Sequence, residues 1–143
     1  MPRPQKERKV HKPPIYTRFK PTGVAAKGLK QIILTLDEYE AIRLSDFYGM
    51  SQEEASEEME ISRPTFTRLI ETARKKMADF LINGKLLSLE GGNIHFRNNV
   101  FKCEDCGQLF TTSLNTEIKT CPNCESANII NLAGGFGHGK CCI

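Results

Sequence analysis

The fold of this chain is decided by residues 51–70, which read SQEEASEEMEISRPTFTRLI. The stretch holds two helix starts. Ser51 followed by Glu54 is a capping box, in which each side chain satisfies a backbone N–H at the helix entrance. Ser62 is a second N-cap candidate, and Pro64 suits the first turn, where its missing N–H costs nothing. The pattern therefore predicts two helices joined by a tight turn.

Two helices joined this tightly must cross and bury side chains against each other. Apolar residues stand where such helices would meet, at Ala55, Met59, Ile61, Phe66 and Leu69. This arrangement leaves Arg63, Thr67 and Arg68 on the outer face of the second helix, where a recognition helix presents its base-reading groups. The stretch predicts a helix-turn-helix that binds double-stranded DNA, and a generic helical hairpin with charged outer faces is the alternative. Glu60 occupies the turn position usually held by glycine, which requires an unfavourable backbone conformation.

Charge is distributed very unevenly along the chain, although the net charge is only +3. Residues 1–30 hold nine Lys or Arg and one acid, residues 31–60 hold nine acids and one Arg, and residues 61–87 hold six basic residues and two acids. Binding to a phosphate backbone needs such local concentrations of positive charge. The N-terminal arm is therefore predicted to contact DNA, with a solvated basic tail as the alternative. Its contact residues would be Arg3, Lys6, Arg8, Lys9 and Lys12.

Capping residues and periodicity predict two further helical features. Thr35 and Glu38 form another capping box, which opens a helix that carries Phe47 on its apolar face and ends around Gly49. The helix that follows Ser62 is predicted to stop at Asn83-Gly84. Its apolar stripe predicts a buried face made by Phe66, Leu69, Ile70, Ala73, Met77, Phe80 and Leu81. Beyond it, the apolar runs 86–89 and 94–96 flank Gly91-Gly92-Asn93 and predict a β-hairpin.

Two cysteine pairs form the second strong signal, Cys103-Glu104-Asp105-Cys106 and Cys121-Pro122-Asn123-Cys124. Two such knuckles complete the four-thiolate tetrahedron that structural zinc prefers. The 14 residues between the pairs allow a short hairpin, with 109–111 and 117–119 as candidate strands. A mononuclear iron site and two redox motifs are the alternatives, but a redox pair normally opens a helix within a βαβ unit. We predict one structural zinc ion held by all four cysteines.

Composition places limits on compartment and partners. The 143 residues are 39% hydrophobic and suit one moderate domain or two small ones. No apolar run approaches the roughly 18 residues that a transmembrane helix needs, and no signal-peptide pattern is present. These features predict a cytoplasmic protein without a membrane partner. In that reducing compartment, six cysteines favour metal binding over disulfides.

Several motifs together resemble a known prokaryotic family. They are FKP at 19–21, LTLDEYEAIRL at 34–44, SRPTF at 62–66 and NGK at 83–85. The family consists of small, functionally uncharacterised, predicted DNA-binding proteins whose helix-turn-helix resembles region 4 of sigma factors. The resemblance covers roughly the first 92 residues, and the ribbon and tail look like an extension that only some members carry. It implies sequence-specific DNA binding and transcriptional regulation.

These observations predict a mainly α fold, with a helix-turn-helix domain followed by a small β zinc ribbon. The expected organisation is a basic arm (1–30), a DNA-binding domain (31–92), a hairpin and zinc ribbon (93–130), and a flexible Gly- and Cys-rich tail (131–143). In the tail, His138, Cys141 and Cys142 could bind a soft metal or sense oxidation, although an unstructured terminus is the simpler interpretation.

The predicted function is that of a transcription regulator that binds double-stranded DNA sequence-specifically, as a monomer or a homo-oligomer. An enzyme is not expected, because no nucleophile–base constellation is present and four-thiolate zinc has no open position. Two other functions stay open. In the first, the ribbon binds RNA polymerase or another protein and the chain is an adaptor. In the second, the C-terminal cysteines sense a metal or redox change.

Overall fold

The computed structural model describes residues 8–134 of the chain. These residues form the α-helices α1 (Leu36–Ile42), α2 (Gln52–Met59) and α3 (Arg63–Asn83). Two shorter helical segments are η1 (Ala26–Gly28), a 3₁₀ turn, and η2 (Arg43–Phe47), a π-helical turn that continues α1. The predicted helix starts are confirmed, because the N-caps of α1, α2 and α3 are Thr35, Ser51 and Ser62. Gly84 ends α3 in the left-handed conformation, at φ +62°, as predicted.

The described residues also form eight strands, so the fold is mixed α/β and the prediction of a mainly α protein is wrong. Six of the eight strands have only two to four residues, too few to show an alternating pattern in the sequence. They form three sheets, with the strand orders β1-β5, β2-β4-β3 and β7-β6-β8. The strands are β1 (Arg8–Val10), β2 (Arg18–Phe19), β3 (Gln31–Leu34), β4 (Leu86–Leu89), β5 (Ile94–Phe96), β6 (Asn98–Cys103), β7 (Leu109–Ser113) and β8 (Ile129–Asn131).

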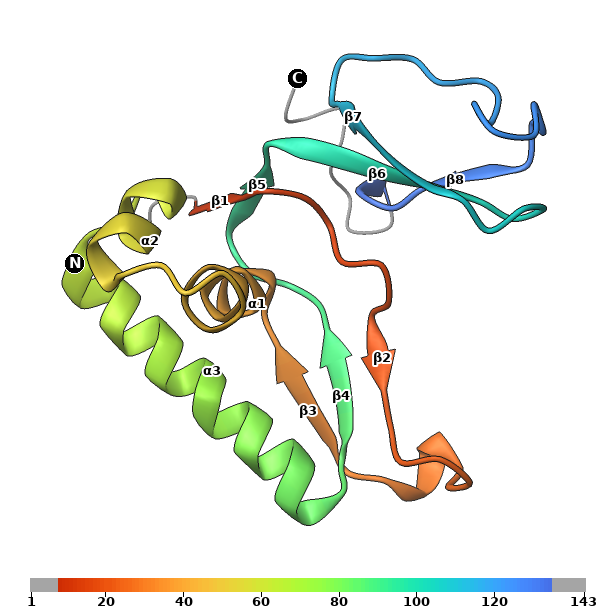
Figure 1. Cartoon of the computed structure of the whole chain (residues 1–143). Coiled ribbons are helices and arrows are strands. Elements are labelled where there is room, and N and C mark those ends of the chain that lie inside the picture. The colour runs from red at the N-terminus through yellow and green to blue at the C-terminus, as the bar shows by residue number, and fades with distance from the viewer. Residues whose placement is uncertain (1–7, 135–143) are drawn as a thin grey trace. The chain divides into compact units, whose positions relative to one another are not determined.

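Among the described residues the chain divides into two compact units, 8–9 with 16–94 and 10–15 with 95–134. In the first unit β4 lies between β2 and β3, antiparallel to β2 and parallel to β3 (Figure 1). The predicted hairpin is wrong, because β4 and β5 do not pair with each other. All four residues of β4 are buried, as expected for a central strand with β2 on one side and β3 on the other. The glycine turn that follows it leads back to α1, where Gly91 O accepts a hydrogen bond from Leu36 N at 3.1 Å.

The helices of the first unit pack around one apolar cluster. Its buried members are Ala41, Leu44, Ala55, Met59, Phe66 and Ile70. Ile61 and Leu69 pack against this cluster and are partly buried. The predicted contacts between the two helices of residues 51–70 are therefore confirmed. Each large side chain buried in this way contributes about 1.5–3 kcal/mol relative to exposure.

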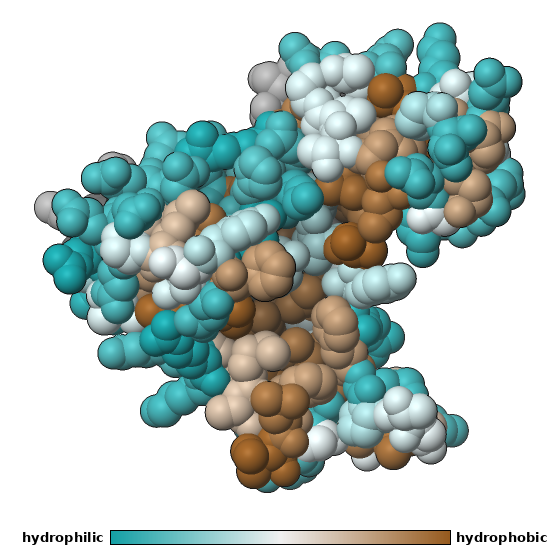
Figure 2. All heavy atoms as spheres, viewed as in Figure 1, coloured by the Kyte–Doolittle hydropathy of each residue, from teal (hydrophilic) through white to brown (hydrophobic). Residues whose placement is uncertain are grey.

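Two residues predicted to be buried lie on the surface instead. Phe47 is 78% exposed and makes an edge-to-face contact with Tyr48, at 5.1 Å between ring centroids. The π-helical turn of η2 explains this, since its wider turn shifts the phase of the apolar face. Leu81 is 70% exposed, because the last turns of α3 extend past the cluster, and Figure 2 shows hydrophobic surface over that end of the helix. No helix within residues 8–134 is both long and apolar enough to cross a membrane.

In the second unit, β6 lies between β7 and β8 and is antiparallel to both. Phe101 of β6 stacks on Phe110 of β7, with ring centroids 5.5 Å apart. The candidate strand at 109–111 lies within β7, but residues 117–119 form no strand. The sheet is completed by β6, which ends at Cys103 of the first cysteine pair, and by β8, which follows the second pair. β7 lies within the segment between the pairs but pairs with β6 rather than with residues 117–119, so the predicted hairpin within that segment is wrong.

Candidate functional site

The entrance of α2 shows one half of the predicted capping box, the bond from the N3 backbone to the N-cap side chain. Ser51 Oγ accepts a hydrogen bond from Glu54 N at 3.1 Å and donates one to Glu54 Oε1 at 3.0 Å. The entrance of α3 is similar, with Ser62 Oγ accepting from Thr65 N at 3.3 Å. Three residues, 60–62, separate the two helices. Local side-chain chemistry thus sets both helix starts, and the turn between them is as short as predicted.

Glu60 carries the unfavourable backbone conformation of this turn. Its φ of 58° and ψ of 43° lie in the left-handed region, which confirms the expectation at this position. Glu60 N donates to Glu57 O at 3.1 Å, and Ile61 N donates to Ser56 O at 3.0 Å. This pair of bonds is the Schellman motif, whose left-handed residue is usually glycine. The turn therefore ends α2 and sets the direction of α3, and Glu60 carries a steric penalty that a glycine would not have.

The three residues predicted to read bases differ in their surroundings. Arg63 and Arg68 are exposed on the first two turns of α3, and neither makes a side-chain hydrogen bond or ion pair with residues 8–134. Thr67 is partly buried, and its hydroxyl donates to Gln52 Oε1 of α2. The Thr67 hydroxyl also lies 3.1 Å from the backbone oxygen of Arg63. Thr67 therefore fastens α3 to α2, whereas the two arginines have no partner in the described chain.

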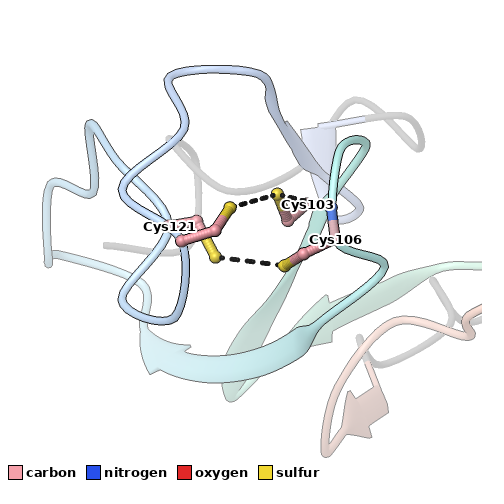
Figure 3. A group of neighbouring side chains, drawn as sticks. Cys103, Cys106 and Cys121 are labelled. Atoms are coloured by element: carbon pink, nitrogen blue, oxygen red, sulfur yellow. Dashed lines mark hydrogen bonds between the residues drawn. The ribbon is translucent and has the colours of Figure 1, made fainter.

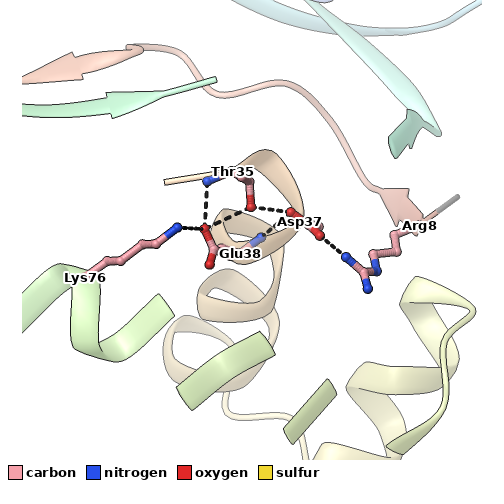
Figure 4. A network of polar contacts seen from close by, with 5 residues as sticks. All are labelled: Arg8, Thr35, Asp37, Glu38 and Lys76. Atoms are coloured by element: carbon pink, nitrogen blue, oxygen red, sulfur yellow. Dashed lines mark hydrogen bonds and ion pairs between the residues drawn. The ribbon is translucent and has the colours of Figure 1, made fainter. Parts of the chain in front are cut away.

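The structure gives Arg8 a partner within the protein. Its guanidinium forms an ion pair with Asp37 in the first turn of α1 (Figure 4), and the two side chains are only 15% and 4% exposed. Glu38, the other acid of that turn, accepts from Lys76 Nζ of α3 at 2.7 Å and from Thr35 N at 2.9 Å. Two buried carboxylates are costly without cations, so Arg8 and Lys76 act first as their counter-ions.

The other predicted arm residues are less constrained. Lys9, in β1, and Lys12, after it, are partly exposed, and no ion pair joins either to another residue of the range 8–134. Arg3 and Lys6 lie outside the described residues, as do His138, Cys141 and Cys142 of the tail. No sequence signal links Arg8 to Asp37, which follows it by 29 positions. The fold brings Arg8 and Asp37 together, although they are far apart in the sequence.

The four cysteines predicted as ligands converge on one point. The sulfur atoms of Cys103, Cys106, Cys121 and Cys124 all lie within 4.8 Å of one another (Figure 3). The distance is 3.5 Å between the sulfurs of Cys103 and Cys124, and 3.7 Å between those of Cys106 and Cys121. Cys103 and Cys121 are buried, while the second cysteine of each pair is exposed. The four thiols are free, and the cluster is compatible with a metal site.

The two knuckles repeat the same backbone geometry. In the first, Cys103 N donates to Gln108 O at 2.9 Å and Gly107 N donates to Cys103 O at 2.9 Å. In the second, Cys121 N donates to Ser126 O at 2.8 Å and Glu125 N donates to Cys121 O at 2.9 Å. Each set of bonds closes the chain around its pair of sulfurs. The two cysteine pairs therefore form turns with the same backbone hydrogen bonds, and the two turns face each other across the sulfur cluster.

Polar side chains join the two knuckles outside the sulfur cluster. Asp105, inside the first cysteine pair, accepts hydrogen bonds from the Ser126 hydroxyl and from Asn128 Nδ2, the latter at 3.4 Å. Asn123, inside the second pair, directs its Nδ2 at Cys106 Sγ, 3.7 Å away, and its backbone N at Cys121 Sγ, 3.4 Å away. Asp105 and Asn123 were not singled out from the sequence. Their places inside the two pairs are the signal that would have identified them.

The thiols of the cluster share charge unequally. The backbone N–H of Gln108 and the side chain of Asn123 lower the pKa of Cys106 to about 6. At Cys124 the backbone N–H of Ser126 favours the thiolate, but the Cys103 thiol, burial and the other two thiols oppose it and raise the pKa to about 12. The cluster therefore favours a thiolate at Cys106 and disfavours a second one at Cys124. A cation at the centre would remove this repulsion, as expected for a metal-binding set of thiolates.

The fold and the cluster define a two-unit α/β protein, with a tight α2–α3 turn in one unit and a four-cysteine cluster in the other. The chain belongs to the family described as "Protein of unknown function DUF134", whose profile matches residues 1–97. The predicted membership of an uncharacterised prokaryotic family is thereby confirmed. The matched residues include α1, α2 and α3 and end before Cys103.

Relatives match to different lengths. A UPF0251 protein of Chloroherpeton thalassium is 46% identical over an alignment of 143 positions, which covers 98% of this chain and 95% of that protein. A UPF0251 protein of Chlorobaculum tepidum is 40% identical over 98% of this chain and 74% of its own length. One from Thermoanaerobacter pseudethanolicus is 55% identical over 93 residues, 65% of this chain and 79% of its own. These names state no activity, and no solved structure matches the chain.

Proposed function

We propose that this protein binds double-stranded DNA sequence-specifically through α3 and regulates transcription in the cytoplasm. The observation that carries the proposal is the state of Arg63 and Arg68, two exposed cations on the first turns of α3 without a partner among the described residues. The N-terminal residues of a recognition helix are those that contact base edges. Arginine is also the side chain best suited to pair with guanine in the major groove. The α2–α3 turn supplies the crossing that presents them, as in the helix-turn-helix of sigma factor region 4.

The charge of α2 restricts how DNA could approach. Residues 51–62 contain no Lys or Arg and five exposed glutamates, Glu53, Glu54, Glu57, Glu58 and Glu60. Such a helix is repelled by a phosphate backbone, which lowers non-specific affinity. Attraction must come from α3 and from basic residues elsewhere. The proposal therefore expects a binder in which base contacts matter more than general attraction.

We also propose that the four cysteines hold one structural zinc ion. Four sulfurs bound at about 2.3 Å around one tetrahedral ion lie about 3.8 Å apart. The observed separations of 3.5 and 3.7 Å across the two pairs are close to that edge length. Bound there, zinc would neutralise the thiolates and cross-link the two knuckles. With four protein ligands the ion would have no open position, so its role would be structural rather than catalytic.

Selection of bound genomic fragments with the purified protein, followed by sequencing, tests the DNA proposal. On the preferred site, Arg68→Ala should cost about 1–3 kcal/mol and relax the preference at one base position. Arg63→Ala should act in the same way at another position. Lys75→Ala, which removes an exposed charge further along α3, is the matched control and should leave the order of preferred sequences unchanged. If both arginine variants bind the site as tightly as wild type, α3 is not the reading element.

A second candidate is an adaptor that binds RNA polymerase or another protein. It is favoured by the exposed aromatic pair Phe47 and Tyr48, 78% and 56% exposed, directly before the acidic α2. Mobility shifts with and without chelator separate the functions. Absence of any sequence-specific binding favours the adaptor. Binding that requires the metal favours either a supporting ribbon or a metal or redox sensor, and binding that survives chelation assigns recognition to the first unit alone.

A further inference from the structure

A second basic surface lies at the end of the first unit where α3 finishes. We call it the basic lobe and define it as residues 16–30 together with Lys85. Residues 8–36 contain seven Lys or Arg and no acid. Four of these basic residues, Arg18, Lys20, Lys27 and Lys30, fall within the lobe. The lobe is therefore the largest excess of positive charge in the described first unit that the proposed recognition helix does not include.

Contacts bring these residues together from separate parts of the chain. Strand pairing places Arg18 opposite Ser88 and Phe19 opposite Leu87, so Lys20 runs toward Lys85 at the start of β4. Lys30 O accepts a hydrogen bond from Leu86 N at 2.9 Å, which sets Lys30 beside Lys85 from the other side. Both lysines line one open cavity, together with Gly28, Leu29, Asn83 and Gly84. Figure 1 shows β2, η1 and the end of α3 at this end of the unit, with α2 at the start of α3.

Most of this charge is available to a ligand. Arg18, Lys27 and Lys30 are exposed, and none of them forms a side-chain hydrogen bond or ion pair with residues 8–134. Lys20 Nζ donates to the backbone oxygen of Val24, which leaves its charge unneutralised. Only Lys85 has an acidic partner, Asp79 at 2.8 Å. A surface with three unpaired cations and one accessible hollow suits a ligand with several negative charges.

We propose that the basic lobe binds the phosphate backbone of duplex DNA without reading its sequence. This inference rests on the proposed function of α3 and extends it to a second contact on the same duplex. The 21 residues of α3 separate the lobe from Arg63 by about 31 Å, at about 1.5 Å per residue. One turn of B-DNA is about 34 Å, so the two surfaces are spaced for successive turns of one duplex.

The spacing of the two basic surfaces favours duplex DNA over a single strand. Single-strand binders stack bases on free aromatic rings. Two aromatic rings of the lobe are exposed, Phe19 to 42% and Tyr16 to 61%. Tyr16 has a partner within the protein. A flexible single strand has no fixed repeat of about 34 Å, so the separation of the two surfaces is what favours the duplex.

The test compares two charge-matched variants of the full-length protein. Lys27→Gln with Lys30→Gln removes two charges from the lobe, while Lys102→Gln with Lys119→Gln removes two charges from the second unit. Affinity for a preferred duplex and for random duplexes is measured across a salt series. Each lost phosphate contact should reduce the slope of log affinity against log salt by about 0.9. We expect the lobe variant to lose about 1.8 from that slope on every sequence and the control variant to keep it.

The outcomes separate this inference from the proposed function. If the wild-type protein binds no duplex DNA, the proposed function fails and the inference fails with it. If the wild type binds specifically but the lobe variant keeps its slope, only the lobe contact is wrong. Equal losses in both variants would assign the effect to total charge and overturn the proposal. Tighter binding to single strands than to duplexes, lost in the lobe variant, would also overturn it. Wild-type ranking of sequences in the lobe variant, with a smaller slope, supports it.

Discussion

Gly107 and Glu125 occupy the same position in the two cysteine knuckles, each directly after the second cysteine of its pair. Their φ angles are +76° and +63°, and each backbone N donates to the first cysteine's oxygen at 2.9 Å. Glycine adopts this conformation without a steric penalty, whereas a glutamate does not. The knuckles are therefore equivalent in geometry but unequal in strain, and the second knuckle holds the strained residue.

This inequality predicts opposite effects of two substitutions. Glu125→Gly should stabilise the metal-free second unit by about 0.5–1 kcal/mol, because it removes the left-handed penalty but loosens the unfolded chain. Gly107→Ala should destabilise it by about 1 kcal/mol. Denaturant titrations in the presence of chelator measure both. Destabilisation by both variants would mean that the Glu125 side chain contributes more than its backbone costs.

The left-handed Glu60 in the α2–α3 turn leads to a related prediction for the first unit. Glu60→Gly should raise the free energy of unfolding by about 0.5–1 kcal/mol, since the Schellman turn accepts glycine at this position. Glu57→Gly is the matched control, because it removes the same charge from the interior of α2 and should cost about 1 kcal/mol. Thermal unfolding of the two variants gives the sign directly. A loss of stability in Glu60→Gly would show that the turn depends on the glutamate side chain.

The cysteine cluster predicts the metal content of the protein. Elemental analysis should find one zinc per chain, and Cys121→Ser should abolish stoichiometric binding, because three thiolates leave the tetrahedron open. Cys141→Ser changes a cysteine outside the described residues that is not one of the four proposed ligands, and it should retain the metal. Chelation should lower the stability of the second unit, since its knuckles lose their cross-link. A metal-free cytosolic protein with disulfides between these cysteines would contradict the zinc proposal.

Local signals account for what could be predicted from the sequence. Ser51 and Ser62 bond to residues three positions away, and the two cysteine pairs each converge within four residues, so both patterns are visible in a short window. Pairing between β3 and β4 joins residues 55 positions apart, such as Gln31 and Leu86, and leaves no local trace. The mixed α/β fold depends on such pairings. The same limit concealed the role of Arg8, whose partner is set by the fold.

The ion pair between Arg8 and Asp37 predicts that Arg8, expected from the sequence to contact DNA, stabilises the first unit. Arg8→Ala should destabilise the first unit by about 2 kcal/mol or more, because it leaves a buried carboxylate without its cation. Lys9→Ala, at the next position, should change stability by about 0.5 kcal/mol at most. Combining Arg8→Ala with Asp37→Asn should recover part of the loss. If the single variant unfolds at the same denaturant concentration as wild type, the pair contributes nothing to stability.

The N-terminal arm can be tested once Arg8 is kept in place. Deleting residues 2–12 would remove both the Arg8 ion pair and the fully buried Val10, so a loss of DNA binding would not be informative. Deleting residues 2–6 removes Arg3 and Lys6 and leaves β1 intact. If both residues contact phosphates, the slope of log affinity against log salt should fall by about 1.8, with the ranking of DNA sequences unchanged. Thermal unfolding of the shortened chain is the control for folding, and its stability should equal that of the wild type. An unchanged slope would show that Arg3 and Lys6 do not contact DNA and would leave the basic lobe and α3 as the surfaces that attract it.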